Sequence, residues 1–246
     1  MSQANGSRAL LCELHAHTTW SDGELTLREL ADLYGRAGFD VLCVTDHVLR
    51  SADPWRVPES CVHEASFASY LTEIDREAER CRALYGMLVV PGVELTHNHR
   101  EPDLSAHALA IGLREFVSPD LGLVGALLAA REAGAALIAA HPHGPEEDLV
   151  PARTTRRFWR EWDTLAPLVH RVELINRWDV YGWAATGELP AVASGDTHSA
   201  GHLSSWKTLV PCEAGERALV SYLRSGRATY LVPFRAAAVE ASVAAA

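Results

Sequence analysis

The stretch LCELHAHTTWSDGE, residues 11–24, directs the interpretation of the fold because an apolar run ends there in two histidines and a polar turn. In a strand, alternate side chains point to the same face, so His15 and His17 would project side by side, about 7 Å apart along the chain. Two neutral imidazoles placed in this way can bind one metal ion. The pair could equally be surface residues at a strand end, and the rest of the chain has to decide.

Short apolar segments alternate with segments of helical periodicity on both sides of this stretch. Leu27, Leu30 and Leu33 form a helical stripe that Gly38 ends. We expect strands at 8–17, 39–47, 87–95, 105–112, 135–143, 171–176 and 189–198, and helices at 25–38, 66–84, 121–134 and 156–169. This alternation predicts parallel pairing with right-handed crossovers, and therefore an α/β barrel or an open doubly wound sheet.

The length of 246 residues suits a single large α/β domain, 1–246. The segment 48–66 is rich in Pro, Ser and charge, and we expect it to be an insertion loop over one end of that domain. The closing segment 235–246 has the composition of a frayed helix or a tail.

Composition and charge exclude several classes of function. The net charge of −10 argues against a broad basic surface that grips long nucleic acid. No apolar run approaches the roughly 18 residues of a membrane span, and no secretory signal is present, so we expect a cytoplasmic protein without a membrane partner. The five cysteines are scattered without a CxxC pair, which suits a reducing compartment.

Nearly every expected strand ends in a residue type that binds metal ions. These residues are His15, His17, Asp46, His47, Glu94, His107, His141, His143, Asn176, Asp196 and His198. In parallel α/β folds the carboxyl ends of the strands converge on one mouth, where active sites form. Imidazole nitrogen with carboxylate oxygen and no thiolate suits zinc, manganese or iron, whereas magnesium alone prefers oxygen ligands.

Six motifs in this order resemble the PHP (polymerase and histidinol phosphatase) family of metal-dependent phosphoesterases: HAHTTWSDGE, VTDH, GVEL, HALAIG, AAHPH and SGDTHS. The resemblance covers residues 9–212 and is specific as an ordered set, although each motif alone is weak. It implies an α/β, distorted (β/α)7 TIM-like barrel with a trinuclear metal centre at the carboxyl ends of the strands.

Carried over residue by residue, the resemblance implies three metal sites that hold up to three divalent ions of zinc, manganese or iron. The first would use His15, His17, Glu94 and Asp196, with Glu94 also bridging to the second. The second would add His107 and His141. The third would use Asp22, His47 and His198.

Some of these positions have competitors. His97 and His99 form a second HxH near Glu94, but we favour His107 because it lies in an apolar strand, whereas THNHREPD is polar and loop-like. His143 could be a ligand, a proton donor or a turn residue. Asp46 would point to the opposite side of its strand from His47, so we expect it to support the ligands rather than to bind metal.

Arg177 and Lys207 are the candidates for binding a substrate phosphate, Arg as a bidentate fork and Lys as a point charge. Each could instead form a surface salt bridge. Lys207 stands out because it is the only lysine in a chain that otherwise uses arginine.

These residues predict a phosphoesterase acting on a small phosphomonoester or nucleotide. Metal ions bridged by Glu94 would lower the pKa of a shared water and leave a hydroxide aimed at phosphorus. His198 or His143 could protonate the leaving alkoxide.

Two other classes of protein remain open. An amidohydrolase is similar, but its usual binuclear form bridges the metals with a modified lysine from a middle strand, and here Lys207 follows the last aspartate. A mononuclear amidohydrolase, acting as a deaminase or amide hydrolase, and a non-catalytic metal-binding module are the alternatives. The sequence predicts no oligomeric state.

Overall fold

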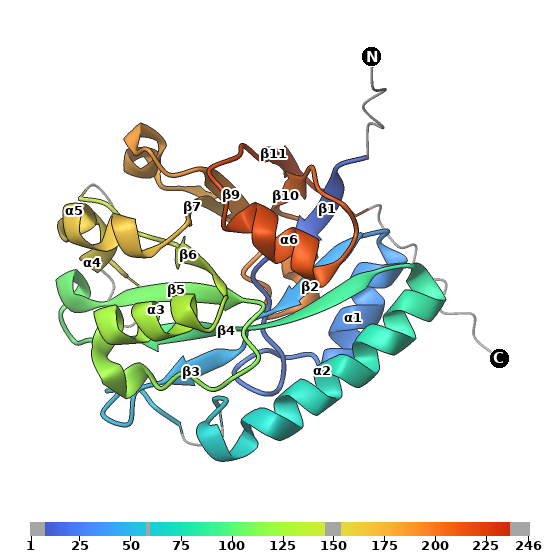
Figure 1. Cartoon of the computed structure of the whole chain (residues 1–246), viewed down its shortest axis with the longest axis horizontal. Coiled ribbons are helices and arrows are strands. Elements are labelled where there is room, and N and C mark those ends of the chain that lie inside the picture. Colours follow the sequence, from blue (N-terminus) through green and yellow to red (C-terminus); the bar gives the residue numbers. More distant parts are fainter. Residues whose placement is uncertain (1–7, 58–59, 146–153, 237–246) are drawn as a thin grey trace.

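A curled mixed sheet forms the centre of the computed structural model, which describes residues 8–57, 60–145 and 154–236 (Figure 1). The strands run in the order β11-β10-β1-β2-β4-β5-β6-β7-β8, while β3 pairs with β4 and β9 with β7. Their bounds are β1 Leu10–Glu13, β2 Val41–Val44, β3 His47–Leu49, β4 Leu88–His97, β5 Ala106–Ile111, β6 Ala136–Ala140, β7 Arg171–Asn176, β8 Asp179–Val180, β9 Ala191–Ser194, β10 Trp206–Val210 and β11 Tyr230–Pro233.

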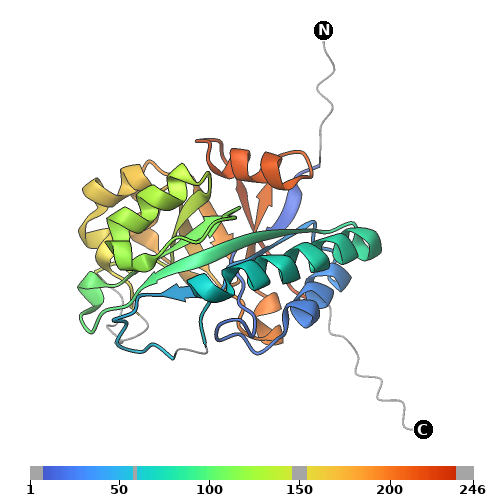
Figure 2. The ribbon, with the colours of Figure 1, turned by 60° about the horizontal axis from the view of Figure 1, so that its bottom comes forward.

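Helices cover the outside of the sheet, and Figure 2 shows α1 and α2 side by side along one flank. Their bounds are α1 Leu27–Arg36, α2 Glu64–Tyr85, α3 Gly122–Glu132, α4 Arg157–Arg160, α5 Trp162–Leu165 and α6 Glu216–Leu223. Helix α1 begins at a capping box, in which Thr26 and Glu29 satisfy each other's backbone N–H groups. Helix α2 ends at Gly86, whose φ of 68° is the left-handed conformation that glycine adopts readily.

The expectation of parallel pairing holds for only part of the sheet. The pairs β1–β2, β2–β4, β6–β7 and β7–β9 are parallel, but β4–β5, β5–β6 and β1–β10 are antiparallel. Residues 98–105 alone connect β4 to β5, and a parallel crossover needs about a dozen residues or more. The chain therefore returns directly along β4, and the parallel pairing predicted from sequence is wrong here.

Two other expected elements differ in detail. The expected loop 48–66 begins in strand β3 and ends in the first turn of α2. The expected helix 156–169 is broken into α4 and α5 at Glu161, whose φ of −111° and ψ of 28° are not helical. The expected tail 235–246 lies, from residue 237 on, outside the described residues.

The curled sheet comes close to closing on itself. The segment after β9 meets the segment after β1 through an isolated parallel bridge between Ala16 and Thr197. The Thr208 hydroxyl on β10 also bonds both backbone groups of Ala193 on β9. This arrangement is consistent with a distorted TIM-like barrel.

The inner face of the sheet is apolar along most of its length and carries polar side chains at one end. Val90, Leu109, Ala140 and Val192 pack together from four strands in one apolar cluster, and α6 contributes Leu219 and Leu223 to it. Because side chains alternate along a strand, Glu94 lies on the same face of β4 as Val90, and His107 on the same face of β5 as Leu109. The polar site therefore lies directly above an apolar floor. None of the described helices combines the length and apolar composition needed to cross a bilayer.

Candidate metal centre

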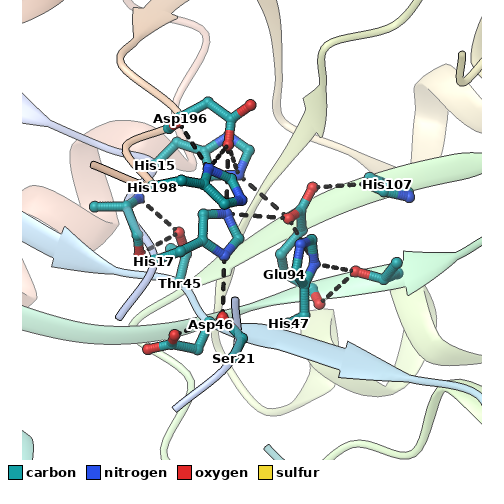
Figure 3. Close-up of polar contacts among 12 residues, drawn as sticks. His15, His17, Ser21, Thr45, Asp46, His47, Glu94, His107, Asp196 and His198 are labelled. Atoms are coloured by element: carbon teal, nitrogen blue, oxygen red, sulfur yellow. Dashed lines mark hydrogen bonds and ion pairs between the residues drawn. The ribbon is translucent and has the colours of Figure 1, made fainter. Parts of the chain in front are cut away.

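Four ligand atoms from three distant parts of the chain converge at one end of the sheet (Figure 3). His15 and His17 follow β1, Glu94 lies on β4, and Asp196 follows β9. His15 Nε2 lies 3.3 Å from Glu94 Oε2 and 3.5 Å from Asp196 Oδ1. His17 Nε2 lies 3.4 Å from each of the same two oxygens.

Two features of these atoms, their lack of hydrogen bonds and their separations, suit them to bind a metal ion. His15 Nε2, His17 Nε2 and Glu94 Oε2 are buried and have no hydrogen-bond partner among the described residues. Buried polar atoms are rarely left unpaired. Ligands 2.0–2.2 Å from a tetrahedral zinc ion would be about 3.4 Å apart. These four imidazole–carboxylate separations match that spacing, and His15, His17 and Asp196 together form one group with metal-ligand spacing, so these residues fit a divalent metal.

The second group forms on the other oxygen of Glu94. His107 Nδ1 and His141 Nε2 lie 3.0 and 3.1 Å from Glu94 Oε1. His107 stands near the beginning of β5, and because β5 runs antiparallel to β4, its beginning lies at the edge where β4 ends. The antiparallel pairing thus brings His107 to the site.

The third group surrounds Asp22, whose Oδ1 lies 3.6 Å from His47 Nε2 and 3.3 Å from His198 Nε2. His17 Nδ1 is 3.7 Å from the same oxygen. All nine residues that the resemblance implies as ligands therefore lie in one cluster, but by distance they group differently from the three implied sets. Within the described residues, the groups with metal-ligand spacing are His17–Asp22–His47–His198, His15–His17–Asp196, His15–Glu94–His141 and His47–Glu94–His107.

The competitors of His107 lie elsewhere. His97 is three residues after Glu94 on β4, so its side chain points to the opposite face of the strand. The His99 ring accepts a hydrogen bond from the Glu101 amide in the turn that follows. The structure brings His107, and neither of these two residues, to the Glu94 carboxylate.

Asp46 fixes the loop that carries His17 and Asp22. Its carboxylate accepts hydrogen bonds from the Thr18 amide at 2.7 Å and the Thr18 hydroxyl at 2.9 Å. It also accepts one from the Ser21 hydroxyl at 2.6 Å (Figure 3). These contacts give Asp46 the supporting position expected for it.

Glu173 is a buried residue of the site that sequence reasoning did not single out. Its Oε1 accepts from His15 Nδ1 at 3.0 Å and from the Ser194 hydroxyl. Its Oε2 accepts from the His141 amide at 2.7 Å and from Asn176 Nδ2 at 3.1 Å. Holding the proton on Nδ1 of His15 leaves Nε2 bare for a metal. A charged residue inside the apolar segment RVELIN is the signal that could have identified Glu173.

Lys207 is not in the pocket, contrary to the phosphate-binding role predicted for it. It is fully buried on β10, and its Nζ donates to the Glu13 carboxylate and to Ser205 Oγ. Glu13 was likewise not singled out from sequence. The physical reason for the difference is that a unique lysine can be a buried counter-ion as well as a surface cation.

Arg177 does lie at the pocket. Its Nη2 is 3.1 Å from Asp196 Oδ2 and 3.2 Å from His198 Nδ1, and Nε and Nη2 both donate to the Asp196 carbonyl. Nη1 forms no hydrogen bond with any residue that the structure describes. One donor edge of the guanidinium therefore remains available to a ligand.

A pocket of about 670 Å³ opens above the three groups. It is lined by Asp22, His47, Glu94, His107, His141, His143, Asn176, Arg177, Asp179, Tyr181, Asp196, His198 and His202. Its volume is in the range that holds small-molecule ligands. His143 lies outside the groups with metal-ligand spacing, half-buried against the ring of Tyr181.

The imidazoles and carboxylates shift each other's pKa values strongly. Burial alone would raise the pKa of Glu94, but the facing His15, His47 and His107 outweigh it and hold the pKa well below its ordinary value. Burial together with the charges of His198 and His47 lowers the pKa of His17 to about 3. The site thus keeps Glu94 ionised and His17 neutral, as metal ligands must be. The facing carboxylates outweigh burial and raise the pKa values of His15, His47 and His198, which would have to release a proton to bind a metal.

These features define an α/β protein of the TIM-like type that carries a cluster of imidazole and carboxylate ligands at one end of its curled sheet. Neither the models of known protein families nor the sequences of curated proteins give a match to the chain.

Solved structures do match. One is a two-domain protein from Bacteroides vulgatus that contains a predicted PHP-like metal-dependent phosphoesterase, with a TM-score of 0.66 and 18% identity over 93% of this chain. The match covers 66% of that longer protein. Another is an amidohydrolase from Chromobacterium violaceum with bound sulfate and no metal, with a TM-score of 0.51 and 16% identity over 76% of this chain and 87% of that one. The chain therefore shares the fold of these two proteins, one of which contains a predicted PHP-like metal-dependent phosphoesterase.

Proposed function

We propose that this protein is a metal-dependent phosphoesterase that hydrolyses a phosphate ester of a small phosphorylated substrate. The observation that carries the proposal is a convergence of buried atoms that form no hydrogen bond with the described residues, namely His15 Nε2, His17 Nε2 and Glu94 Oε2. Each of the two nitrogens lies 3.3–3.5 Å from this Glu94 oxygen and from Asp196 Oδ1. Such an arrangement of bare nitrogens and oxygens is costly unless a cation completes it.

Up to three divalent transition metals would be held by the residues of the three groups. When bound, these ions would polarise the phosphoryl oxygens and make a coordinated water acidic. Glu94 would connect the groups, because Oε2 faces His15 and His17 while Oε1 faces His107 and His141.

The chain's own residues would orient the substrate. Arg177 would bind a phosphate oxygen through its available Nη1 edge and hold the phosphorus in line for attack. His143 lines the pocket outside the ligand groups and would donate a proton to the leaving oxygen. Burial lowers its pKa to about 4, so the negative charge of a bound phosphate would have to restore that proton. His198 is the second candidate for this proton, because its contacts with Asp22 and Asp196 outweigh burial and raise its pKa.

Metal analysis and phosphate release test this proposal together. Purified protein loaded with zinc, manganese or iron should contain more than one equivalent per chain and release phosphate from a panel of sugar phosphates, amino-alcohol phosphates and nucleoside bisphosphates. An Asp196→Asn variant should lose metal and reduce turnover at least about 100-fold. Full activity in chelator-treated protein would contradict the proposal.

An amidohydrolase activity is the second candidate, because the Chromobacterium violaceum protein with the same fold carries that name. The location of Lys207, paired with Glu13 away from the pocket, argues against a form in which a modified lysine bridges the metals. A deaminase and amide-hydrolysis assay on the same metal-loaded preparation separates the two activities. Metal binding without any turnover would favour the non-catalytic module.

A further inference from the structure

The single lysine of the chain lies beneath the candidate metal centre. Lys207 has no exposed surface, and its Nζ donates to Glu13, to Ser205 Oγ at 2.8 Å and to the His202 carbonyl at 3.5 Å. Removing an ammonium group from water is costly unless the charge is paired and hydrogen-bonded. The partner of Lys207 therefore indicates what the lysine does.

That partner, Glu13, joins two segments that are distant in sequence. Its Oε1 accepts from the His15 amide at 3.1 Å and the Gly195 amide at 2.8 Å. Its Oε2 accepts from the Tyr34 hydroxyl at 2.8 Å and from Lys207. Both carboxylate oxygens of Glu13 thus act as acceptors only, and the Lys207 ammonium lies beside them as the paired cation.

The anchored segments carry two of the ligands. His15 Nε2 and Asp196 Oδ1 lie 3.5 Å apart, and Asp196, with a φ of 41°, directly follows Gly195. A Cβ at Gly195 would lie under 3.0 Å from Lys207 Nζ and from Glu13 Oε2. The ion pair therefore packs directly against the backbone that must hold Asp196 in a left-handed conformation.

We propose that Glu13 and Lys207 form a buried ion pair that positions the His15 and Asp196 segments for metal binding, and that Lys207 has no contact with the substrate. The inference rests on the proposed metal site. Both residues are positioning residues, since neither offers an atom to the pocket.

Metal titration of three variants tests the inference: Lys207→Met, Glu13→Gln and the double variant. Each single variant should bind one metal equivalent about 10–100-fold more weakly than the wild type. The visible absorption of bound Co²⁺, which depends on coordination geometry, should change with it. The double variant should recover most of the affinity, because a glutamine oxygen still accepts from both amides, Tyr34 can accept from its NH2 group, and no charge is left unpaired.

The control is Arg114→Met, which removes a cation from an exposed pairing with Asp75 and Glu216. It should leave metal affinity and the Co²⁺ spectrum unchanged. A Lys207→Met variant that binds metal like the wild type but shows a raised KM for p-nitrophenyl phosphate would overturn the inference. So would a double variant no better than either single one. If a single variant fails to fold, the metal affinity of the double variant alone tests the inference. A double variant that binds metal more than about 10-fold more weakly than the wild type would contradict the inference.

The two proposals fail in different ways. If the wild type itself binds no metal, the proposed function is wrong. If the wild type binds metal and Lys207→Met matches it in affinity and spectrum, the positioning role alone is wrong.

Discussion

Replacing Glu173 by glutamine should weaken metal binding more than it weakens the fold. The side chain is fully buried, and its two oxygens accept four hydrogen bonds. His15 Nδ1 and the Ser194 hydroxyl donate to Oε1, and the His141 amide and Asn176 Nδ2 donate to Oε2. A glutamine can serve only one of these pairs of donors with its oxygen.

The orientation of the new amide follows from which donors can adapt. If its NH2 group faced the His141 amide, a buried backbone donor would be left unpaired at a cost of about 1–3 kcal/mol. If it faces Ser194 and His15 instead, the hydroxyl can accept, and the imidazole can accept at Nδ1 by moving its proton to Nε2. All groups are then satisfied, so the free energy of unfolding should fall by only about 1 kcal/mol.

The same rearrangement removes a ligand. With its proton on Nε2, His15 offers no lone pair toward Glu94 and Asp196, so we expect metal affinity to fall about 10–100-fold. Urea unfolding of the metal-free protein measures the free energy of unfolding, and calorimetric titration with Zn²⁺ measures the metal affinity. Glu77→Gln is the matched control, because Glu77 is equally buried but pairs with Arg28 and Arg80 outside the site. It should cost about 1–3 kcal/mol of stability and no metal affinity. Wild-type metal affinity in Glu173→Gln would refute this account of His15.

Three further predictions concern the pocket and the fold. Arg177→Met should raise the KM for phosphate esters about 10–100-fold, the loss expected for one charged hydrogen bond, and steady-state kinetics with an unchanged KM would contradict its role. His143→Gln should slow the hydrolysis of an alkyl phosphate about 100-fold and that of p-nitrophenyl phosphate far less, since only the alkoxide leaving group needs protonation. Equal losses of rate on the two esters would exclude His143 as the general acid. Burial beside Arg50 lowers the pKa of His97 from 6.5 to about 3, so only the unfolded chain takes up this proton above pH 3. Stability should therefore fall by about 2 kcal/mol between pH 7 and pH 5, and urea unfolding of His97→Gln should lack this loss.

Much of the site could be predicted because its residues follow apolar strands. A polar residue at the end of an apolar run has to lie at an edge of the sheet, and the runs ending in Glu94, His141 and Asp196 do meet there. The antiparallel pairing of β4 and β5 could also have been predicted, since the connecting residues 98–105 are too few for a parallel crossover. That pairing is what turns His107, at the start of its strand, into a neighbour of Glu94.

The ion pair between Glu13 and Lys207 could not be predicted in the same way. Glu13 and Lys207 are 194 residues apart in sequence, and only the folding of β1 beside β10 brings them together. A sequence shows that a charge exists but not which opposite charge it meets, so a lone lysine in a metal protein suggested substrate binding. A glutamate inside an apolar segment, as with Glu173 in RVELIN and Glu13 in RALLCELHAH, was the signal of an internal carboxylate, because such a residue requires donors around it.

Three residues at the mouth of the pocket have left-handed backbone conformations that non-glycine residues rarely adopt. They are His141, Arg177 and Asp196, with φ angles of 28°, 55° and 41°. Each such conformation costs about 1–3 kcal/mol and persists only where its surroundings hold it. A strand that continued in the extended conformation would send its next side chain to the opposite face. The left-handed turn is therefore what keeps these side chains at the pocket.

The anchors of this strained backbone are the buried acceptors beneath it. Glu173 accepts from the amide of His141 at 2.7 Å, and Glu13 accepts from the amide of Gly195, the neighbour of Asp196, at 2.8 Å. An ionised carboxylate accepts a hydrogen bond more strongly than a neutral group, which suits it to hold a conformation that would otherwise relax. The carboxylates of this site thus divide into those that offer oxygens to a metal and those that hold the backbone on which the ligands stand. On this basis, loss of an anchor should change the geometry of the ligands while leaving every one of them in the chain.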